Sequence, residues 1–236
     1  MDQDFIKILV VDDEEDLCEI LQFNLESQGY HVSVAYSAEE ALKYKIEDFH
    51  LILLDVMMEG MSGYRFAEKV RKELELSIPI IFLTARGSEN DLLTGFNLGG
   101  DDYITKPFSP RELVSRVKAV LRRIESTSVS SDELIEVDDR LKIDFNRREI
   151  WVEGKLVKLR PTEYRLLYHL VQNAGWVLTY DQILSRVWGY EYRDEPHYVR
   201  LYINYLRQKL EKDPSNPKYV LTERGVGYRF YDYRRK

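Results

Sequence analysis

The chain has 236 residues and a formal net charge of -7, and its 44% hydrophobic and 32% charged residues are typical of a soluble globular protein. Its apolar runs are too short to cross a bilayer, its first residues carry acid where a secretory signal carries base, and its single cysteine, Cys18, excludes an internal disulfide. These features exclude membrane-spanning and disulfide-rich classes and predict a cytoplasmic protein with no membrane segment.

Charge divides the chain into two halves. Residues 1–124 carry 14 Lys and Arg against 23 Asp and Glu, whereas residues 134–236 carry 20 against 15. Between them, residues 125–133 are small, polar and without periodicity, which is typical of a flexible linker. The pattern predicts an acidic domain, a linker and a basic domain, and the basic domain is a candidate to bind nucleic acid.

The first half predicts five successive units of a strand and a helix. The predicted strands span residues 6–11, 31–35, 51–54, 79–83 and 101–105. The first predicted helix ends near residue 28, and the second begins at a Ser37–Glu40 capping box. The other three predicted helices span residues 62–73, 88–98 and 109–124. Because the run at residues 51–54 is apolar without alternation, it favours a strand buried on both faces. The repeat predicts an α/β fold, a five-stranded doubly wound parallel sheet.

The second half has a different order of elements. Short alternating segments are predicted at residues 134–137, 141–144, 149–152 and 155–159, helices at 161–173, 180–188 and 196–212, and a closing hairpin at 219–231. Turn residues separate the short segments, which favours an antiparallel sheet. A sheet, three helices and a hairpin predict an α+β domain that resembles a winged helix.

Polar residues stand just past the ends of the predicted parallel strands: Asp12, Asp13, Asp55, Thr84 and Lys106. Each has an ordinary alternative, since aspartates cap turns and helices and a lysine is usually solvated. Parallel sheets collect their chemistry at these strand ends, however, so the set favours one joint site. Three carboxylates repel one another, and Mg²⁺ prefers such oxygen ligands. With Lys106 as a second positive charge, Asp55 is a candidate nucleophile that accepts a phosphoryl group. The bond between Lys106 and Pro107 is a candidate cis peptide.

Residues 6–124 resemble the receiver domain of bacterial two-component response regulators, which has a flavodoxin-like fold. The motifs that carry the resemblance are Val-Val-Asp12-Asp13-Glu, Leu-Leu-Asp55-Val-Met, Met-Ser-Gly63, Leu-Thr84-Ala85 and Gly-Asp101-Asp-Tyr103-Ile-Thr-Lys106-Pro-Phe. The resemblance implies that Asp55 is the phospho-acceptor and that Lys106 contacts the phosphoryl group. It implies that Asp13, Asp55 and the backbone carbonyl of Met57 bind Mg²⁺, with Asp12 holding metal-bound waters. It also implies a switch pair, Thr84 and Tyr103, although Tyr103 alone would equally suit a packed strand aromatic.

The resemblance further implies a symmetric dimer on the face of the last strand and helix of the receiver. The candidate residues on this face are Asp101, Asp102, Glu112, Arg116 and Arg123. The chain departs from the family pattern at three positions. Glu59 stands where the family usually has proline, and Leu92 and Asn97 stand where close relatives often have arginine and glutamate. The usual set of salt bridges across the dimer is therefore incomplete.

Residues 134–231 resemble the winged-helix effector domain of the OmpR/PhoB family. The carriers are Leu159-Arg-Pro-Thr-Glu-Tyr164, Gly175-Trp-Val-Leu-Thr-Tyr180, Val187-Trp188-Gly189, Tyr205-Leu-Arg-Gln-Lys-Leu210 and Arg224-Gly-Val-Gly-Tyr-Arg-Phe230. The third helix is then expected in the major groove of DNA. The sequence of this helix departs from the common family pattern and looks more like the potassium-responsive KdpE subgroup.

The outer face of the third helix is predicted to present His197, Tyr198, Arg200, Leu201, Asn204 and Arg207. On this reading Arg200 suits a guanine, Asn204 an adenine, and Arg207 a phosphate. Arg224, in the hairpin turn, suits a phosphate or the minor groove. The alternative is a charged helix face that only meets solvent.

Together these resemblances imply a phosphorylation-activated transcriptional regulator. A sensor histidine kinase is expected to phosphorylate Asp55, and the chain is expected to dimerise, to bind double-stranded promoter DNA and to contact RNA polymerase through residues 189–195. It is expected to accept a phosphoryl group and to dephosphorylate itself, and it is not expected to be a turnover enzyme. Two alternatives stay open. One is a Mg²⁺-dependent phosphohydrolase, which multiple turnover on phosphate esters would reveal. The other is a DNA binder with equal affinity with and without a phosphoryl donor.

Overall fold

The computed structural model describes residues 6–85, 100–125 and 134–234, which form two compact units, Met1–Leu121 and Arg122–Lys236. The predicted domain bounds stay predictions, because the linker falls almost wholly outside the described residues. The predicted helix at residues 88–98, with Leu92 and Asn97, also lies outside them. No helix in the described part of the chain is long and apolar enough to span a membrane.

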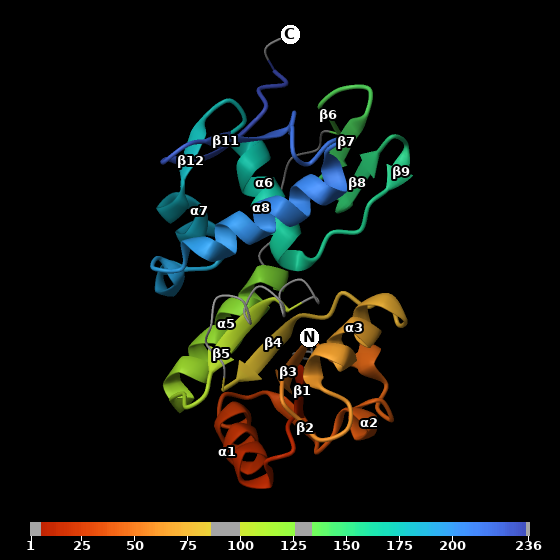
Figure 1. Ribbon diagram of the computed structural model, residues 1–236, viewed down its shortest axis with the longest axis vertical. Coiled ribbons are helices and arrows are strands. Elements are labelled where there is room, and N and C mark those ends of the chain that lie inside the picture. Colours follow the sequence, from red (N-terminus) through yellow and green to blue (C-terminus); the bar gives the residue numbers. More distant parts are fainter. Residues whose placement is uncertain (1–5, 86–99, 126–133, 235–236) are drawn as a thin grey trace. The chain divides into compact units, whose positions relative to one another are not determined.

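The first unit is built on a five-stranded parallel sheet with the strand order β2-β1-β3-β4-β5 (Figure 1). Its strands are β1 (Lys7–Val11), β2 (His31–Ala35), β3 (Leu51–Asp55), β4 (Ile80–Thr84) and β5 (Asp102–Thr105). β3 lies at the centre and all five of its residues are buried. This strand order confirms the predicted doubly wound parallel sheet, and the apolar run without alternation forms its fully buried central strand.

Helices cover both faces of this sheet (Figure 1). They are α1 (Glu15–Glu26), α2 (Ala38–Ala41), the short 3₁₀ helix η1 (Ile46–Asp48), α3 (Gly63–Lys72) and α5 (Pro110–Glu125). At the start of α2, Ser37 Oγ accepts the backbone N–H of Glu40 at 3.1 Å, as the capping motif predicts. The Glu40 carboxylate instead accepts the N–H of Tyr36, so only half of the predicted capping box forms.

Residues 134–234, the described part of the second unit after the linker, contain two antiparallel sheets and three α-helices. The four-stranded sheet comprises β6 (Ile135–Glu136), β7 (Leu141–Asp144), β8 (Glu149–Val152) and β9 (Lys155–Leu156). The helices are α6 (Pro161–Gln172), α7 (Tyr180–Val187) and α8 (Pro196–Leu210), with a 3₁₀ helix, η2 (Tyr190–Tyr192), before α8. This arrangement confirms the predicted winged-helix architecture.

The closing hairpin of the second unit gains a third strand that the sequence did not predict. β10 (Val177–Thr179) pairs with β12 (Gly227–Phe230), and β12 pairs with β11 (Val220–Glu223). Three residues are too few to show an alternation of their own. A side chain at Gly227 would overlap the backbone carbonyl of Leu178, so glycine is what allows β10 to approach.

Candidate functional site

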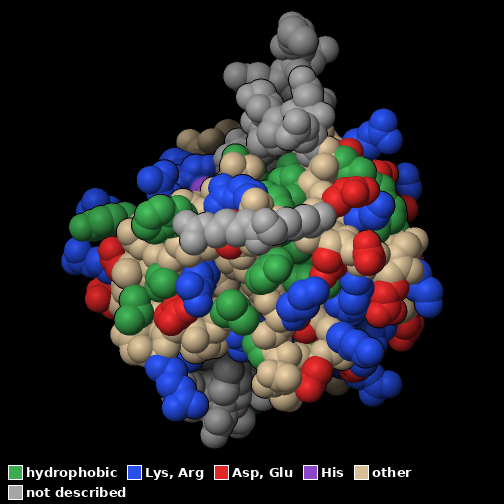
Figure 2. Space-filling view, turned by 90° about the horizontal axis from the view of Figure 1, so that it is seen from above, with side chains coloured by type: hydrophobic (Ala, Val, Ile, Leu, Met, Phe, Trp, Pro, Cys, Tyr) green, Lys and Arg blue, Asp and Glu red, His purple; other side chains and the backbone are tan. Residues whose placement is uncertain are grey.

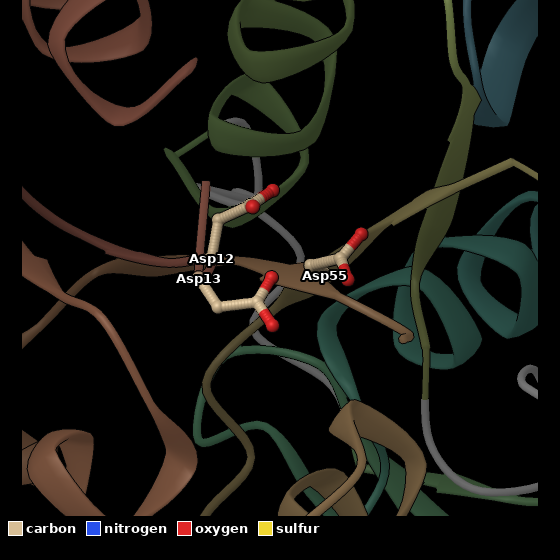
Figure 3. Close-up of side chains that lie close together, drawn as sticks. All are labelled: Asp12, Asp13 and Asp55. Carbon is tan, nitrogen blue, oxygen red and sulfur yellow. The ribbon is translucent and has the colours of Figure 1, made fainter. Parts of the chain in front are cut away.

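Three carboxylates meet at the carboxyl end of the parallel sheet (Figure 3). Asp12 and Asp13 follow β1, Asp55 ends β3, and one oxygen from each lies within 4.8 Å of the other two. Asp12 and Asp55 are buried, with 0% and 4% of their surface exposed, whereas Asp13 is exposed. The pairing of β1 with β3 brings Asp12 close to Asp55, which lies 43 positions later in the chain.

Lys106 completes the site from the segment that follows β5. Its Nζ lies 2.9 Å from Asp12 Oδ2, from Asp55 Oδ1 and from Glu14 Oε1. The peptide bond between Lys106 and Pro107 is cis, as predicted. Although burial by itself would lower the pKa of Lys106, its three carboxylate partners hold that pKa above its usual value. Lys106 is therefore a fixed positive charge beside the predicted phospho-acceptor.

Burial raises the pKa of both Asp12 and Asp55, and hydrogen bonds from Lys106 only partly oppose this. The pocket is thus short of positive charge for its carboxylates. Three closely spaced carboxylates, one of them open to solvent, fit the oxygen preference of Mg²⁺. The donor set therefore suits the predicted cofactor.

The loop after β3 is tied to these carboxylates through its backbone. The N–H of Met57 donates to Asp55 Oδ2 at 2.8 Å, and the N–H of Glu59 donates to Asp13 Oδ2 at 3.2 Å. A proline at position 59 has no N–H, so this departure from the family pattern adds a bond that holds Asp13. A side chain at Gly63, where α3 begins, would overlap the carbonyl oxygen of Asp55.

The predicted switch residues lie on the two neighbouring strands. Thr84 ends β4 and is 1% exposed, and Tyr103 in β5 is 4% exposed. The Tyr103 ring lies 5.1 Å from that of Phe82, its register partner on β4. Tyr103 therefore occupies the buried one of the two positions that a switch aromatic requires.

The acidic residues predicted on the dimer face form ion pairs within the chain in this conformation. Asp101 and Asp102 are 1% and 0% exposed. Asp101 Oδ2 accepts from Arg71 Nη2 at 3.1 Å, and Asp102 Oδ1 lies 3.3 Å from Arg116 Nη1. Arg116 also pairs with Glu112, at 3.4 Å. The Arg123 side chain lies outside the described part of the structure, and the dimer face itself stays a prediction.

On α8, the predicted outer face is only partly correct. Arg200 and Asn204 are exposed and His197 is half-buried, but Tyr198 and Leu201 are 2% and 6% exposed. The prediction that Tyr198 and Leu201 face outward is wrong, because both belong to the stripe of α8 that packs inward. The Tyr198 ring meets that of Trp188 edge-on at 5.9 Å.

Sequence reasoning missed one exposed position on this face. Gln208 lies four residues after Asn204 and eight after Arg200, so helical periodicity puts the three side chains on one stripe. That spacing was available as a signal. Arg224 is exposed in the turn between β11 and β12, as predicted. In the view of Figure 2, Lys and Arg side chains are spread among acidic and hydrophobic ones.

Comparison with known proteins supports both halves of this description. Residues 8–118 match the family model of the response regulator receiver domain, and residues 154–230 match that of the C-terminal domain of transcriptional regulatory proteins. The alkaline phosphatase synthesis transcriptional regulatory protein PhoP of Bacillus subtilis is 43% identical over 231 residues, covering 94% of this chain and 95% of PhoP. The crystal structure of DrrB, an OmpR/PhoB homolog of Thermotoga maritima, is 34% identical, with a TM-score of 0.53, over 96% of this chain and 99% of DrrB. The chain belongs to the OmpR/PhoB family of response regulators.

Two further relatives agree with this assignment. The probable transcriptional regulator ycf27 of Cyanophora paradoxa is 44% identical over 231 residues, covering 95% of both chains. The structure of a RitR mutant is 29% identical with a TM-score of 0.75, over 96% of this chain and 99% of RitR. As an OmpR/PhoB-type response regulator, the protein is a phosphorylation-dependent transcriptional regulator with a DNA-binding winged-helix domain.

Proposed function

We propose that Asp55 is the phospho-acceptor of this regulator and that a sensor histidine kinase is the donor. A carboxylate oxygen of Asp55 attacks the phosphorus of a phosphohistidine. The phosphorus–nitrogen bond breaks, and its electron pair stays on the imidazole nitrogen, which takes up a proton. The observation that carries the proposal is the contact of 2.9 Å between Lys106 Nζ and Asp55 Oδ1, since it puts a positive charge where the transferred oxygens arrive.

Asp13, Asp55 and the backbone carbonyl of Met57 would hold Mg²⁺ directly, and Asp12 would hold its waters. When bound, the ion neutralises negative charge on the phosphoryl oxygens during transfer. The close approach of three carboxylates supports this assignment, because it favours a divalent cation. Thr84, at the end of β4, would donate its hydroxyl to the phosphoryl group.

Phosphorylation would act through Thr84 and Tyr103 on the face formed by β5 and α5, where two copies of the chain would dimerise. Two DNA-binding domains held together bind adjacent half-sites more tightly than one, because the second contact becomes intramolecular. The acids of this face already pair with Arg71 and Arg116 within one chain. Exchange of such internal pairs for pairs across the dimer would give the switch two stable arrangements.

In the DNA-binding domain, α8 would enter the major groove with Arg200 and Asn204 toward the bases. His197 and Arg207 would lie at its borders, and Arg224 would contact a phosphate or the minor groove. The exposure of Arg200, Asn204 and Arg224 supports these roles. The segment at residues 189–195 would contact RNA polymerase. The KdpE-like subtype rests on the sequence of α8 alone and stays a prediction.

The protein would work in the cytoplasm, and hydrolysis of its own aspartyl phosphate would return it to the resting state. It would accept one phosphoryl group on Asp55 and would not turn over a separate substrate.

The phospho-acceptor is tested with Asp55→Asn, acetyl phosphate and Mg²⁺. The wild-type chain should gain the mass of one phosphoryl group, form dimers and bind promoter DNA more tightly. Asp55→Asn should do none of these, because an amide is a poor nucleophile. Asp48→Asn, at a solvent-exposed acid that pairs with Lys45, is the matched control and should behave as wild type. Mass gain and dimerisation of Asp55→Asn would show that another residue is the acceptor.

A further inference from the structure

The end of α8 holds the hairpin of the wing through two charged side chains four residues apart, Arg207 and Glu211. We propose that this pair, called the wing clamp from here on, fixes the wing (residues 220–230) to α8. On this proposal Arg207 is a positioning residue rather than a phosphate contact. The inference rests on the proposed DNA contacts of α8 and Arg224, and it adds how the two are held in one geometry.

Arg207 reaches both strands of the wing. Its Nε and Nη2 donate to the carbonyl oxygen of Val220 at 3.0 and 2.6 Å, and Nη2 also lies 2.8 Å from Thr222 Oγ1. The guanidinium carbon lies 5.8 Å from the ring centre of Tyr228, on the opposite strand. The Nε and Nη2 donors of Arg207 are thus directed at the wing.

The carboxylate of Glu211 accepts the backbone N–H groups at the start of β11 and just before it. Its Oε1 accepts from the backbone N–H of Tyr219 at 2.8 Å and of Val220 at 2.9 Å, and its Oε2 accepts from that of Lys218 at 2.8 Å. The residue is 6% exposed. A buried carboxylate is favourable only when such donors satisfy its oxygens, so the carboxylate and this segment depend on each other.

Together the two side chains bind both backbone groups of Val220, the first residue of β11. β11 is an edge strand of the three-stranded sheet β10-β12-β11. Arg207 in the last turn of α8 and Glu211, the residue that follows the helix, thus satisfy backbone groups that an edge strand otherwise leaves to solvent or to another chain. On this proposal α8 and the wing bind DNA as one preorganised unit. Binding then requires less ordering of the wing relative to α8.

The first test is hydrogen exchange of the free full-length chain, which needs no DNA. Arg207→Gln should speed amide exchange across residues 220–230, whereas the neighbouring exposed position gives a matched control, Gln208→Ala, which should not. Thr222→Val removes one acceptor and keeps the arginine, and should speed exchange in the same segment to a smaller extent. Exchange in this segment that matches the control for both variants would overturn the clamp.

The second test separates positioning from phosphate contact. The probe is a duplex selected by the phosphorylated wild-type chain from a randomised pool, and Arg224→Ala is measured in the wild-type and Arg207→Lys backgrounds. Lysine keeps the positive charge but cannot form the fork to Val220. The clamp predicts that Arg224→Ala weakens binding about tenfold in the wild type and much less in Arg207→Lys, since the two sites are coupled.

The salt dependence of binding gives a further readout. With the clamp, Arg207→Gln lowers affinity, and in the Arg224→Ala background it leaves the slope of log K against log salt unchanged, because Arg207 itself neutralises no phosphate. A slope smaller by about 0.9, with the same cost of Arg224→Ala in both backgrounds, would show a phosphate contact and overturn the positioning role. Faster wing exchange together with no effect of Arg224→Ala in the wild type would support the clamp and overturn the proposed DNA contact of Arg224.

Discussion

The carboxyl end of the receiver sheet and the outer face of α8 differ in what decides which side chains lie there. At the sheet, Asp12, Asp55 and Lys106 meet because parallel strands end at one edge and their register leaves little choice. On α8, helical periodicity specifies which residues share a stripe but not which stripe faces the core. Tyr198 and Leu201 are buried although they were expected to face outward. The residues of a site at parallel strand ends can be predicted from the topology of the sheet. The residues of a site on a helix can be predicted only when it is also known which face of the helix packs against the core.

The largest effect is expected where the receiver site depends on close backbone approach. Gly63→Ala would place a methyl group 2.0 Å from the carbonyl oxygen of Asp55, and a backbone atom shifts only at a high energetic cost. We expect the free energy of unfolding to fall by more than about 4 kcal/mol, or the receiver not to fold.

The control for Gly63→Ala is Gly154→Ala. Its backbone φ is +75° and nothing lies within 4 Å of an added Cβ, so only conformational strain applies. It should cost about 1 kcal/mol. Denaturant unfolding of both variants measures the difference, and equal costs would show that close approach does not position the start of α3.

The second unit also contains a buried carboxylate, Glu163, but this one stabilises the fold and belongs to no reactive site. Glu163, which is fully buried, accepts from Lys209 Nζ at 2.6 Å and from Arg160 Nε at 3.0 Å. Glu163→Gln should lower the free energy of unfolding by about 3 kcal/mol near neutral pH, because it leaves two cations without their carboxylate. Glu153→Gln, at an exposed acid, should have little effect.

The cost of Glu163→Gln should depend on pH in a defined direction. Burial by itself would raise the pKa of the Glu163 carboxyl, but Arg160 and Lys209 hold it below its usual value of 4.5. The stabilisation from the ionised carboxylate is therefore present above pH 4.5 and is lost as the pH falls through the folded-state pKa. Unfolding of the wild type and the variant should converge at acid pH. A gap that stays constant across the pH range would show that ionisation of Glu163 does not contribute.

The smallest effects separate the two faces of α8 directly. Leu201→Ala should lower the free energy of unfolding by about 2 kcal/mol, because it removes a buried side chain. Arg200→Ala should leave unfolding nearly unchanged but weaken DNA binding by about 1–3 kcal/mol, since Arg200 is exposed on the proposed reading face. Paired unfolding and DNA-binding titrations test both variants. A loss of stability in Arg200→Ala without a loss of affinity would reverse the assignment of the two faces.

Most of the architecture was predictable because its signals are local. Apolar runs that end in polar residues predicted the parallel strands near residues 6–11, 51–54 and 79–83, and the repeated strand–helix order predicted the other two. Gly175, Gly189 and the turn at 223–227 marked the ends of elements in the second unit. β10 was missed because its pairing with β12 joins residues 50 positions apart and has no local pattern. The interior use of Asp101 was missed for the same reason, since its partner Arg71 lies on another element.

The sequence by itself determined the two-part organisation, the parallel sheet and the carboxylates at its edge, because spacing along the chain translates directly into strand ends. Only the tertiary structure decided which stripe of α8 is buried, that the N–H of Glu59 holds Asp13, and that Arg207 and Glu211 hold the wing. Each of these depends on the distance between segments far apart in the chain. Such distances are set by packing, which no local pattern of residues records.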